Sequence, residues 1–246
     1  DTCTEMGDEK VSGFALDVWS RASGGQLPAD IVHRAIEKER HDVQATAQVL
    51  LAEAGRLVGH NELPEAEQTL EQARAVCRKV GMMNAWVSPV LPWLATTYRL
   101  QWERTTDLVP QRRRQLLDKA SRATRQALAV ARKFQTDLPH ALREAGLVAA
   151  MQGSTQKARK YLDESLAVAE RQDARFEHAQ TLLARGRIGM EVDWPGSADD
   201  VATARQNLRT LGADFTLDET QEPAPTKFAT LSLVDRFDKA LEAGRR

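Results

Sequence analysis

Two sixteen-residue stretches of this chain nearly repeat each other, and this repetition limits the possible folds more than any other feature. Residues 119–134 read KASRATRQALAVARKF and residues 157–172 read KARKYLDESLAVAERQ, an offset of 38 residues from 119 to 157. A fainter third copy, EAEQTLEQARAVCRK, occupies residues 65–79. Similarity at such a spacing is typical of chains built from stacked copies of one small structural unit.

The residues of these stretches favour helix. Alanine, leucine, arginine, glutamate and glutamine dominate them, and all are strong helix formers. Between residues 42 and 58, apolar side chains recur every three or four positions, as on one face of a helix. Alternation typical of strands is essentially absent. We therefore expect an all-α protein, with helices over residues 28–40, 42–58, 64–80, 84–104, 110–135, 138–152, 155–171, 174–192, 197–211 and 227–246.

Breaks in the helical pattern predict four regions. Residues 1–27, which contain several glycines, are expected to form an N-terminal leader segment before a helical repeat domain over 28–212. Residues 213–226 are acidic and contain prolines, as a linker would. Residues 227–246 are expected to form a helix that connects to a following domain or pairs with a second copy. The apolar face of that helix comprises Phe228, Leu231, Val234, Phe237 and Leu241.

Composition narrows the class of protein. The chain has 42% hydrophobic residues and a net charge of −1, so no overall field favours nucleic acid or membrane. No apolar run approaches the 18 or more residues of a membrane-spanning helix. Cys3 and Cys77 have neither metal-ligand nor disulfide-scaffold spacing, which favours a reducing cytoplasm. Because the chain begins without methionine and stops within a helical pattern, we expect it to be part of a longer protein.

Small residues recur where paired helices would cross closely. In residues 139–172, Gly146 and Ala158 occupy such positions and Leu162 follows one turn later. This pattern resembles the tetratricopeptide repeat, a helix–turn–helix unit of 34 residues. Residues 84–134 carry the matching first-helix signature. The other residues that carry the resemblance are Leu94, Ala95, Tyr98, Ala120 and Ala127, then Gly55, Ala66, Leu70 and Ala73, and finally Ala184, Ala204 and Leu208.

The resemblance covers residues 42–211 and is degenerate. The small second-helix residues Ala66, Ala120, Ala158 and Ala204 are 54, 38 and 46 residues apart rather than 34, and the repeat's characteristic proline is missing. The resemblance implies antiparallel helix pairs stacked as a right-handed α-solenoid. An irregular helical bundle is the alternative.

The segments TDLPHALREAGLVAAMQG and TLLARGRIG are similar to helical-repeat regions of large multidomain bacterial signalling proteins, namely kinases or cyclases with a signalling ATPase. In those proteins the ATPase precedes the repeats and a sensor or output domain follows. The resemblance implies a cytoplasmic regulatory domain that acts in signal transduction.

Signatures of catalysis are missing from the sequence. It contains no phosphate-binding glycine loop, no dinucleotide fingerprint, no His-Glu-x-x-His and no nucleophile with an adjacent base. His140 and His178 are separated by 38 residues, the repeat offset, but a metal site would need ligands that the sequence does not supply. We therefore expect no enzyme activity, no cofactor and no metal, and interpret the two histidines as polar residues inherited by duplication.

Two further features have competing interpretations. Residues 110–133 are rich in cations and could contact phosphates, but no aromatic residues are interleaved with them, so a solvated outer face is the better interpretation. The tryptophans Trp86, Trp93 and Trp102 are expected to pack in the core, although an exposed one would be an anchor for a bound peptide. The cations are Arg112, Arg113, Arg114, Lys119, Arg122, Arg125, Arg132 and Lys133.

The repeat register predicts a concave groove lined by the first helix of each pair. Because arginine binds carboxylates through two hydrogen bonds, we expect this groove to bind an acidic peptide or an acidic surface of a neighbouring domain. Charge reversal at Arg143 and Arg185 should then abolish binding, with Arg112 and Arg113 as convex-side controls. A pocket for a small anionic effector and a passive spacer are the alternatives. The expected groove residues are Arg56, Thr96, Arg99, His140, Arg143, His178, Thr181 and Arg185.

Overall fold

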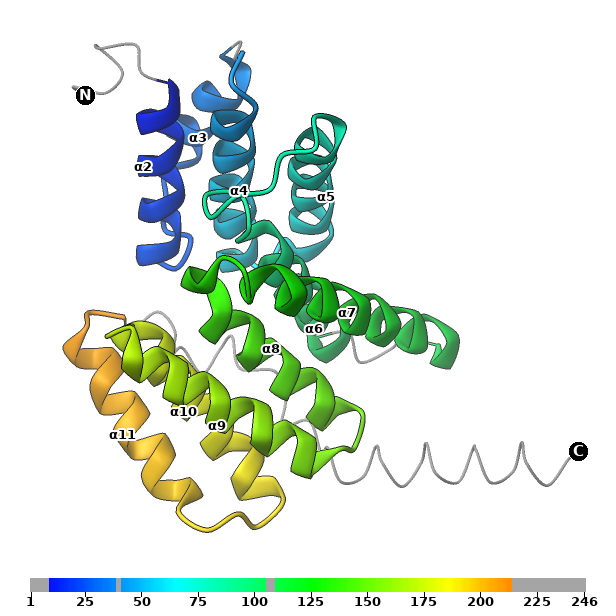
Figure 1. Cartoon of the computed structure of the whole chain (residues 1–246), viewed down its shortest axis with the longest axis vertical. Helices are drawn as coiled ribbons and strands as arrows, with labels where there is room; N and C mark the ends of the chain where they lie inside the picture. Colours follow the sequence, from blue (N-terminus) through cyan, green and yellow to red (C-terminus); the bar gives the residue numbers. More distant parts are fainter. Residues whose placement is uncertain (1–8, 39–40, 105–108, 214–246) are drawn as a thin grey trace, which may run out of the picture. The chain divides into compact units, whose positions relative to one another are not determined.

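The computed structural model describes residues 9–38, 41–104 and 109–213, and in these ranges all regular secondary structure is helical (Figure 1). The prediction of an all-α fold is confirmed. The helices are α2 (Glu9–Ala22), α3 (Ala29–Glu37), α4 (Val43–Gly59), α5 (Leu63–Lys79), α6 (Val90–Arg104), α7 (Pro110–Ala131), the 3-10 turn η1 (Gln135–Asp137), α8 (Leu138–Met151), α9 (Thr155–Arg171), α10 (Arg175–Glu191) and α11 (Ser197–Thr210).

Local sequence determines where these helices begin and end. The carboxylate of Asp42 accepts a hydrogen bond of 2.8 Å from the backbone N–H of Ala45 and so caps the first turn of α4. Pro64 and Pro110 lie in the first turns of α5 and α7, where proline is tolerated. After α8, Gly153 adopts a φ of 72°, a left-handed conformation that glycine provides without strain.

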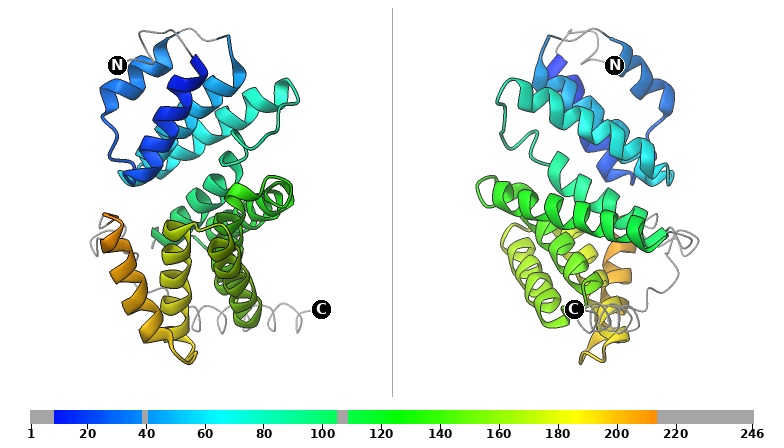
Figure 2. Two further views of the ribbon diagram at one scale, coloured as in Figure 1. Left: turned by 60° about the vertical axis from the view of Figure 1, so that its left-hand side comes forward. Right: turned by 90° about the vertical axis from the view of Figure 1, so that its right-hand side faces the viewer.

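The chain divides into two compact units, residues 1–137 and 138–246, and each is described by itself. In the first unit α4 packs against α2 and α5, α5 against α6, and α6 against α7. In the second unit α8 packs against α9, α9 against α10, and α10 against α11. Figure 2 shows the helices of both units from two further directions. The most extensive contacts join α10 with α11, α8 with α9, α4 with α5 and α6 with α7, which are consecutive in the sequence, and also α2 with α4, which are not.

The segment expected to be a leader contains a helix of the first unit. The Ser20 hydroxyl of α2 donates a 2.7 Å hydrogen bond to the Ala52 carbonyl of α4, and a Cβ on Gly13 would lie 3.0 Å from the Ala45 carbonyl. Because the residue numbers of these contacting positions increase together along both helices, α2 and α4 run parallel. The short helix α3 lies between them in the sequence and returns the chain.

Helix α4 is buried on all sides. Every residue from Ala47 to Leu57 is buried, including Gln48, Glu53 and Arg56. A helix that is apolar or buried around its whole circumference occupies the interior of a domain rather than its surface. The two faces of α4 are covered by α2 and α5, so α4 is the centre of the first unit.

Small residues lie at the helix crossings, though not always in the predicted pairing. The four alanines of the second helices are completely buried, and a Cβ on Gly146 would lie 2.6 Å from Cγ of Leu162. Gly55, however, faces Ser20 of α2 instead of α5. In α10, Gly186 approaches α11 closely, since a Cβ there would lie 2.7 Å from Val201.

Two predicted segments lie outside the described residues. They are most of the linker over 213–226 and all of the connector helix over 227–246, including the pairing with a second copy that was suggested for this helix.

Candidate functional site

The arginines predicted for the groove already have carboxylate partners. Arg56 of α4 is buried and donates from Nε and Nη2 to the two carboxylate oxygens of Glu53, at 2.8 and 2.9 Å. This bidentate hydrogen bonding raises the pKa of Arg56. In α6, Nη1 of Arg99 donates to Glu103 at 2.8 Å, and Thr96 of the same helix is buried.

In the second unit the predicted residues join helices to one another. Arg143 of α8 donates to Glu177 of α10. Arg185 of α10 donates to both carboxylate oxygens of Asp200 in α11, at 2.7 and 2.9 Å, and to Asp163 of α9 at 2.9 Å. Arg185 therefore contacts the second helix of its own pair as well as α9.

The remaining predicted residues also lie in packed surroundings. Nε2 of His140 is 4.0 Å from Glu144 of the same helix, and His140 is buried. Thr181 is completely buried, with its hydroxyl 2.9 Å from that of Ser165. His178 is partly exposed and follows Glu177, the partner of Arg143. The eight residues are divided between the two units. The contacts of Arg143, Thr181 and Arg185 join different helices, whereas those of Arg56, Arg99 and His140 described above stay within one helix.

Helix α7 presents cations on its outer side. Arg114, Arg125 and Arg132 are separated by 11 and 7 residues, close to three and two whole turns, so they form one stripe along the helix. Arg122 and Lys133 flank this stripe, and all five side chains are exposed. We call these five residues the basic face. It spans about 27 Å from Arg114 to Arg132 at 1.5 Å per residue.

The cations of the basic face differ from the others in their surroundings. Within the described ranges, none of the five side chains takes part in a hydrogen bond or an ion pair, and Asp118 is the single carboxylate in the sequence of α7. On the inner side of the same helix, Lys119 pairs with Glu67 at 2.6 Å and the Arg113 guanidinium lies 4.1 Å from the ring centroid of Trp102. The inner cations thus stabilise the fold, while the side chains of the outer cations are surrounded by solvent.

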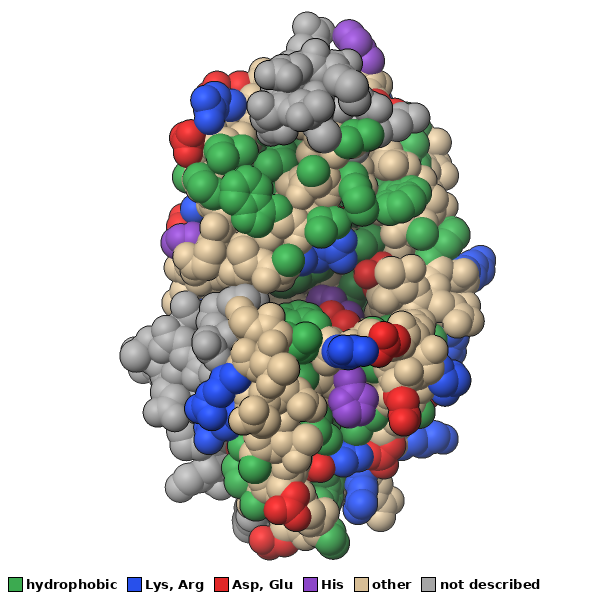
Figure 3. Space-filling view, turned by 90° about the vertical axis from the view of Figure 1, so that its left-hand side faces the viewer, with side chains coloured by type: hydrophobic (Ala, Val, Ile, Leu, Met, Phe, Trp, Pro, Cys, Tyr) green, Lys and Arg blue, Asp and Glu red, His purple; other side chains and the backbone are tan. Residues whose placement is uncertain are grey.

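An apolar surface lies on α2. Val11, Phe14 and Val18 follow helical spacing and are each about two-fifths exposed, and hydrophobic side chains gather over α2 in Figure 3. Phe14 packs edge-to-face against Trp86 with ring centroids 5.1 Å apart, and Trp86 is 49% exposed. Of the three tryptophans expected in the core, Trp102 is buried, Trp93 is partly buried and Trp86 lies at the surface.

Other kinds of site have no support in the part of the chain that the structure describes. No group of three or more histidine, cysteine, aspartate and glutamate side chains is arranged to hold a metal ion there. Among the same residues, each helix is too short or too polar to cross a membrane.

Comparison with known proteins adds no relative: no family model, no curated protein and no solved structure matches this chain. The basic face is therefore the candidate site, on the strength of its geometry and charge alone.

Proposed function

We propose that this chain is a non-catalytic protein-interaction and regulatory scaffold, a tetratricopeptide-like region of stacked antiparallel helix pairs within a larger cytoplasmic signalling protein. Its ligand is an acidic segment of a partner protein or of a neighbouring domain, as the sequence suggested. The contact surface is the basic face of α7 rather than the arginines of the groove.

One observation carries this proposal: the cations of the basic face lack carboxylate partners, whereas Arg56, Arg99, Arg143 and Arg185 all have them. An acidic ligand at a groove arginine would have to displace an internal carboxylate and leave it unpaired. At the basic face it would displace only water. Exposed arginines suit carboxylates because the planar guanidinium offers two parallel donors.

Binding through an exposed basic face has a recognisable dependence on salt. Charges in solvent are screened over about 10 Å at 0.1 M ionic strength, so affinity should decrease steeply as salt is added. Complementary charge also accelerates encounter more than it prolongs the complex. This behaviour suits a regulatory contact that forms and dissociates quickly.

The test is a titration of a fluorescent peptide of alternating glutamate and serine, followed by anisotropy. The double variant Arg114→Glu with Arg125→Glu should weaken binding at least about tenfold, the effect of losing roughly 1.4 kcal/mol. The matched control, Arg78→Glu with Lys79→Glu, changes the same charge at exposed positions of α5 in the same unit and should bind like the wild type.

Two results would reject the proposal. Equal weakening by both double variants would show attraction by net charge alone. Binding of an oligonucleotide but not of the acidic peptide, with loss in the α7 variant, would make the basic face a nucleic-acid surface instead.

A further inference from the structure

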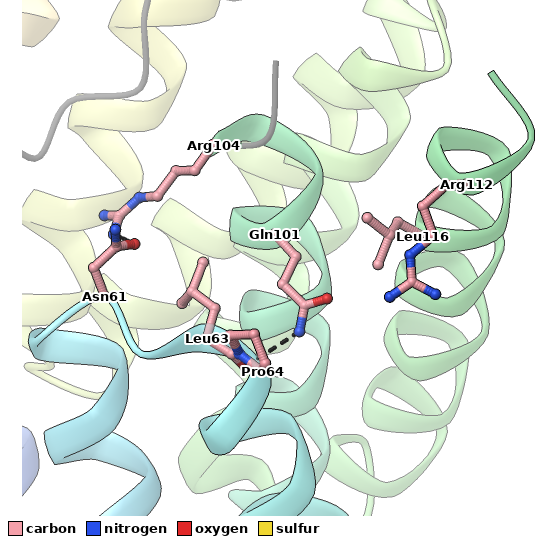
Figure 4. A pocket seen from close by; sticks show the side chains of 7 residues that line it. All are labelled: Asn61, Leu63, Pro64, Gln101, Arg104, Arg112 and Leu116. Atoms are coloured by element: carbon pink, nitrogen blue, oxygen red, sulfur yellow. Dashed lines mark hydrogen bonds between the residues drawn. The ribbon is translucent and has the colours of Figure 1, made fainter. Parts of the chain in front are cut away.

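Two features of the first unit lie outside the proposed function. One is a pocket of about 260 Å³ where the turn after α4, the end of α6 and the start of α7 meet (Figure 4). Arg104 donates there to the side-chain oxygen of Asn61. The Gln101 amide donates to the Leu63 carbonyl at 3.2 Å and to Glu67 at 2.8 Å. These hydrogen bonds attach the turn after α4 and the start of α5 to α6, so they serve the fold.

The other feature is the outer side of α2. On its inner side, Gly13, Leu16 and Ser20 are buried. A surface helix normally has charged and polar side chains opposite its buried stripe. In α2, every exposed residue between positions 11 and 22 is apolar instead. We call these residues the α2 apolar face: Val11, Phe14, Ala15, Val18, Trp19 and Ala22.

The aromatic rings make this face large. Trp19 is 44% exposed, and Phe14 extends the face to the exposed Trp86, against which it packs. An aromatic side chain covers about 150–250 Å² when it is fully buried, so two fifths of it leaves roughly 60–100 Å² in water. With Val11 and Val18, the exposed apolar side chains amount to roughly 400 Å². Patches of this size on a soluble protein are often functional.

We propose that the α2 apolar face binds the same face of a second copy of this chain, with the two α2 helices antiparallel about a two-fold axis. Val11, Ala15, Val18 and Ala22 are 4, 3 and 4 residues apart, as are the core positions of a two-helix coiled coil. An axis between residues 16 and 17 sets Val11 opposite the partner's Ala22 and Ala15 opposite the partner's Val18. Each layer then combines a larger with a smaller side chain, and this register uses all four positions at once.

The residues beside this core are compatible with the pairing. Phe14 lies next to the partner's Phe14 on one side, and Trp19 next to the partner's Trp19 on the other. Arg21 borders the face and donates to Asp17 of its own helix at 2.7 Å. Because Arg21 is level with the partner's Ser12, the two Arg21 residues are about 13 Å apart along the axis. This separation exceeds the screening length of about 10 Å at 0.1 M ionic strength.

The orientation of the two helices is also favourable. In an antiparallel pair, the positive N-terminal end of each helix dipole lies beside the negative C-terminal end of the other. The alanines and the rim bring the area buried by two copies to about 1,000 Å², the lower limit of specific interfaces. We therefore expect a reversible dimer with a dissociation constant of about 1–100 µM.

This inference is independent of the function proposed above, since the α2 apolar face and the basic face share no residue. The two contacts also respond differently to salt. Binding of an acidic peptide to the basic face should weaken as salt is added, whereas an apolar contact between two α2 helices should not.

The first test is sedimentation equilibrium of the full chain between about 2 and 200 µM. The wild type should pass from monomer to dimer over this range. Val18→Glu should weaken dimerisation at least about tenfold, because it places a carboxylate against the partner's Ala15. Since Val18 is exposed, the fold should be retained. The matched control, Met190→Glu, adds the same charge at an exposed apolar residue of α10 and should dimerise like the wild type.

The second test is disulfide trapping in a background with Cys3 and Cys77 replaced by alanine. A mixture of Val11→Cys and Ala22→Cys chains should cross-link on mild oxidation. Val11→Cys alone should not, because the two copies of residue 11 are about 16 Å apart along the axis. A disulfide needs Cα atoms within about 7 Å. Parallel pairing would give the reverse result.

Several results would overturn the inference. It is wrong if the wild type stays monomeric at about 200 µM, if Val18→Glu and Met190→Glu have equal effects, or if Val11→Cys alone is trapped. It is also wrong if Val234→Glu abolishes the dimer while Val18→Glu does not, because the copies then pair through residues 227–246. Peptide binding by the basic face is measured separately, so either result can stand without the other.

Discussion

The hydroxyl of Ser20 in α2 and the backbone carbonyl of Ala52 in α4 are joined by a buried hydrogen bond of 2.7 Å, across 32 residues of sequence. One turn further along α4, a Cβ on Gly55 would lie 2.5 Å from the same Ser20 oxygen. The glycine therefore leaves room for the hydroxyl, and the hydroxyl links the parallel helices α2 and α4. In an isolated pair of α4 and α5, without α2, Gly55 and Ser20 would not have these roles.

The variant Gly55→Ala tests this dependence. Alanine favours helix over glycine by up to about 1 kcal/mol, so an isolated helix would be stabilised. Here the new methyl group should displace the Ser20 hydroxyl and reduce the free energy of unfolding by about 1 kcal/mol, the value of one hydrogen bond. In a Ser20→Ala background the same change should be neutral or stabilising. Urea unfolding of the four proteins measures both effects, and equal effects in both backgrounds would contradict the prediction.

Ala158, completely buried at the crossing of α8 and α9, should not tolerate a larger side chain. Replacement by leucine should decrease the free energy of unfolding by about 1–3 kcal/mol through overpacking. Ala167 lies on the exposed side of the same helix, and its replacement by leucine should change stability by less than about 0.5 kcal/mol. Thermal unfolding compares the two variants. An unchanged midpoint for Ala158→Leu would remove the repeat register assigned to this pair.

Asp17 should make the stability of the first unit depend on pH. Burial raises the pKa of its carboxyl to about 6, despite the opposing effect of Arg21, which donates to it at 2.7 Å; Asp137 adds a smaller increase. Because the folded pKa lies above the unfolded value of 3.8, the protonated form favours folding. Relative to Asp17→Asn, the free energy of unfolding of the wild type should therefore fall by up to about 3 kcal/mol as pH rises from about 4 to 6.

Urea unfolding at several pH values provides that measurement, and the difference between the two proteins should be level above pH 7. Asp30→Asn serves as the control, since Asp30 is exposed in α3 and pairs only with Arg34 in its own helix. A difference that stays constant, or that grows as pH rises, would show that Asp17 is not titrated in this way.

Arg185 and Asp200 should be coupled energetically. Two hydrogen bonds join them, and hydrogen bonding to Asp200 raises the pKa of Arg185. Because both side chains are partly exposed, solvent screens the pair and the coupling should be about 1 kcal/mol. A double-mutant cycle of Arg185→Gln and Asp200→Asn measures it, and added salt should reduce it. Additive effects of the two changes would mean that the contact contributes no stability.

Sequence periodicity predicted the helices from α3 to α11, mostly to within a few residues at their ends, because the apolar stripe and the terminal residues are local signals. The exception is α6, which begins at Val90 rather than at residue 84. The parallel α2 was missed because Gly13 suggested a break, whereas in the structure this glycine allows close contact with α4. The predicted groove illustrates the main limit. Helical spacing shows which face carries Arg143, but not that Glu177 of another helix has already neutralised it.

The same limit explains why the basic face was first interpreted as solvated surface only. Both the basic face and the predicted groove contain several cationic residues that are conspicuous in the sequence. The number of cations therefore does not show which of the two could bind a ligand. They differ in whether their cations have carboxylate partners. For Arg143 and Arg185 these carboxylates belong to other helices, so the pairing depends on how the helices pack. Charge in a sequence is therefore informative about binding only once its internal partners are known.

The burial of α4 on every side has a consequence for the order in which the first unit forms. A helix of 17 residues with so few polar side chains has no solvent-facing stripe, so it gains its stability only when α2 and α5 both cover it. The contacts between α2 and α4 bridge about 30 residues, and closing that loop is an entropic cost that precedes them. We therefore expect the backbone amides of α4 to show the slowest hydrogen exchange in the unit. Any opening that releases α2 should expose one apolar face of α4 to solvent.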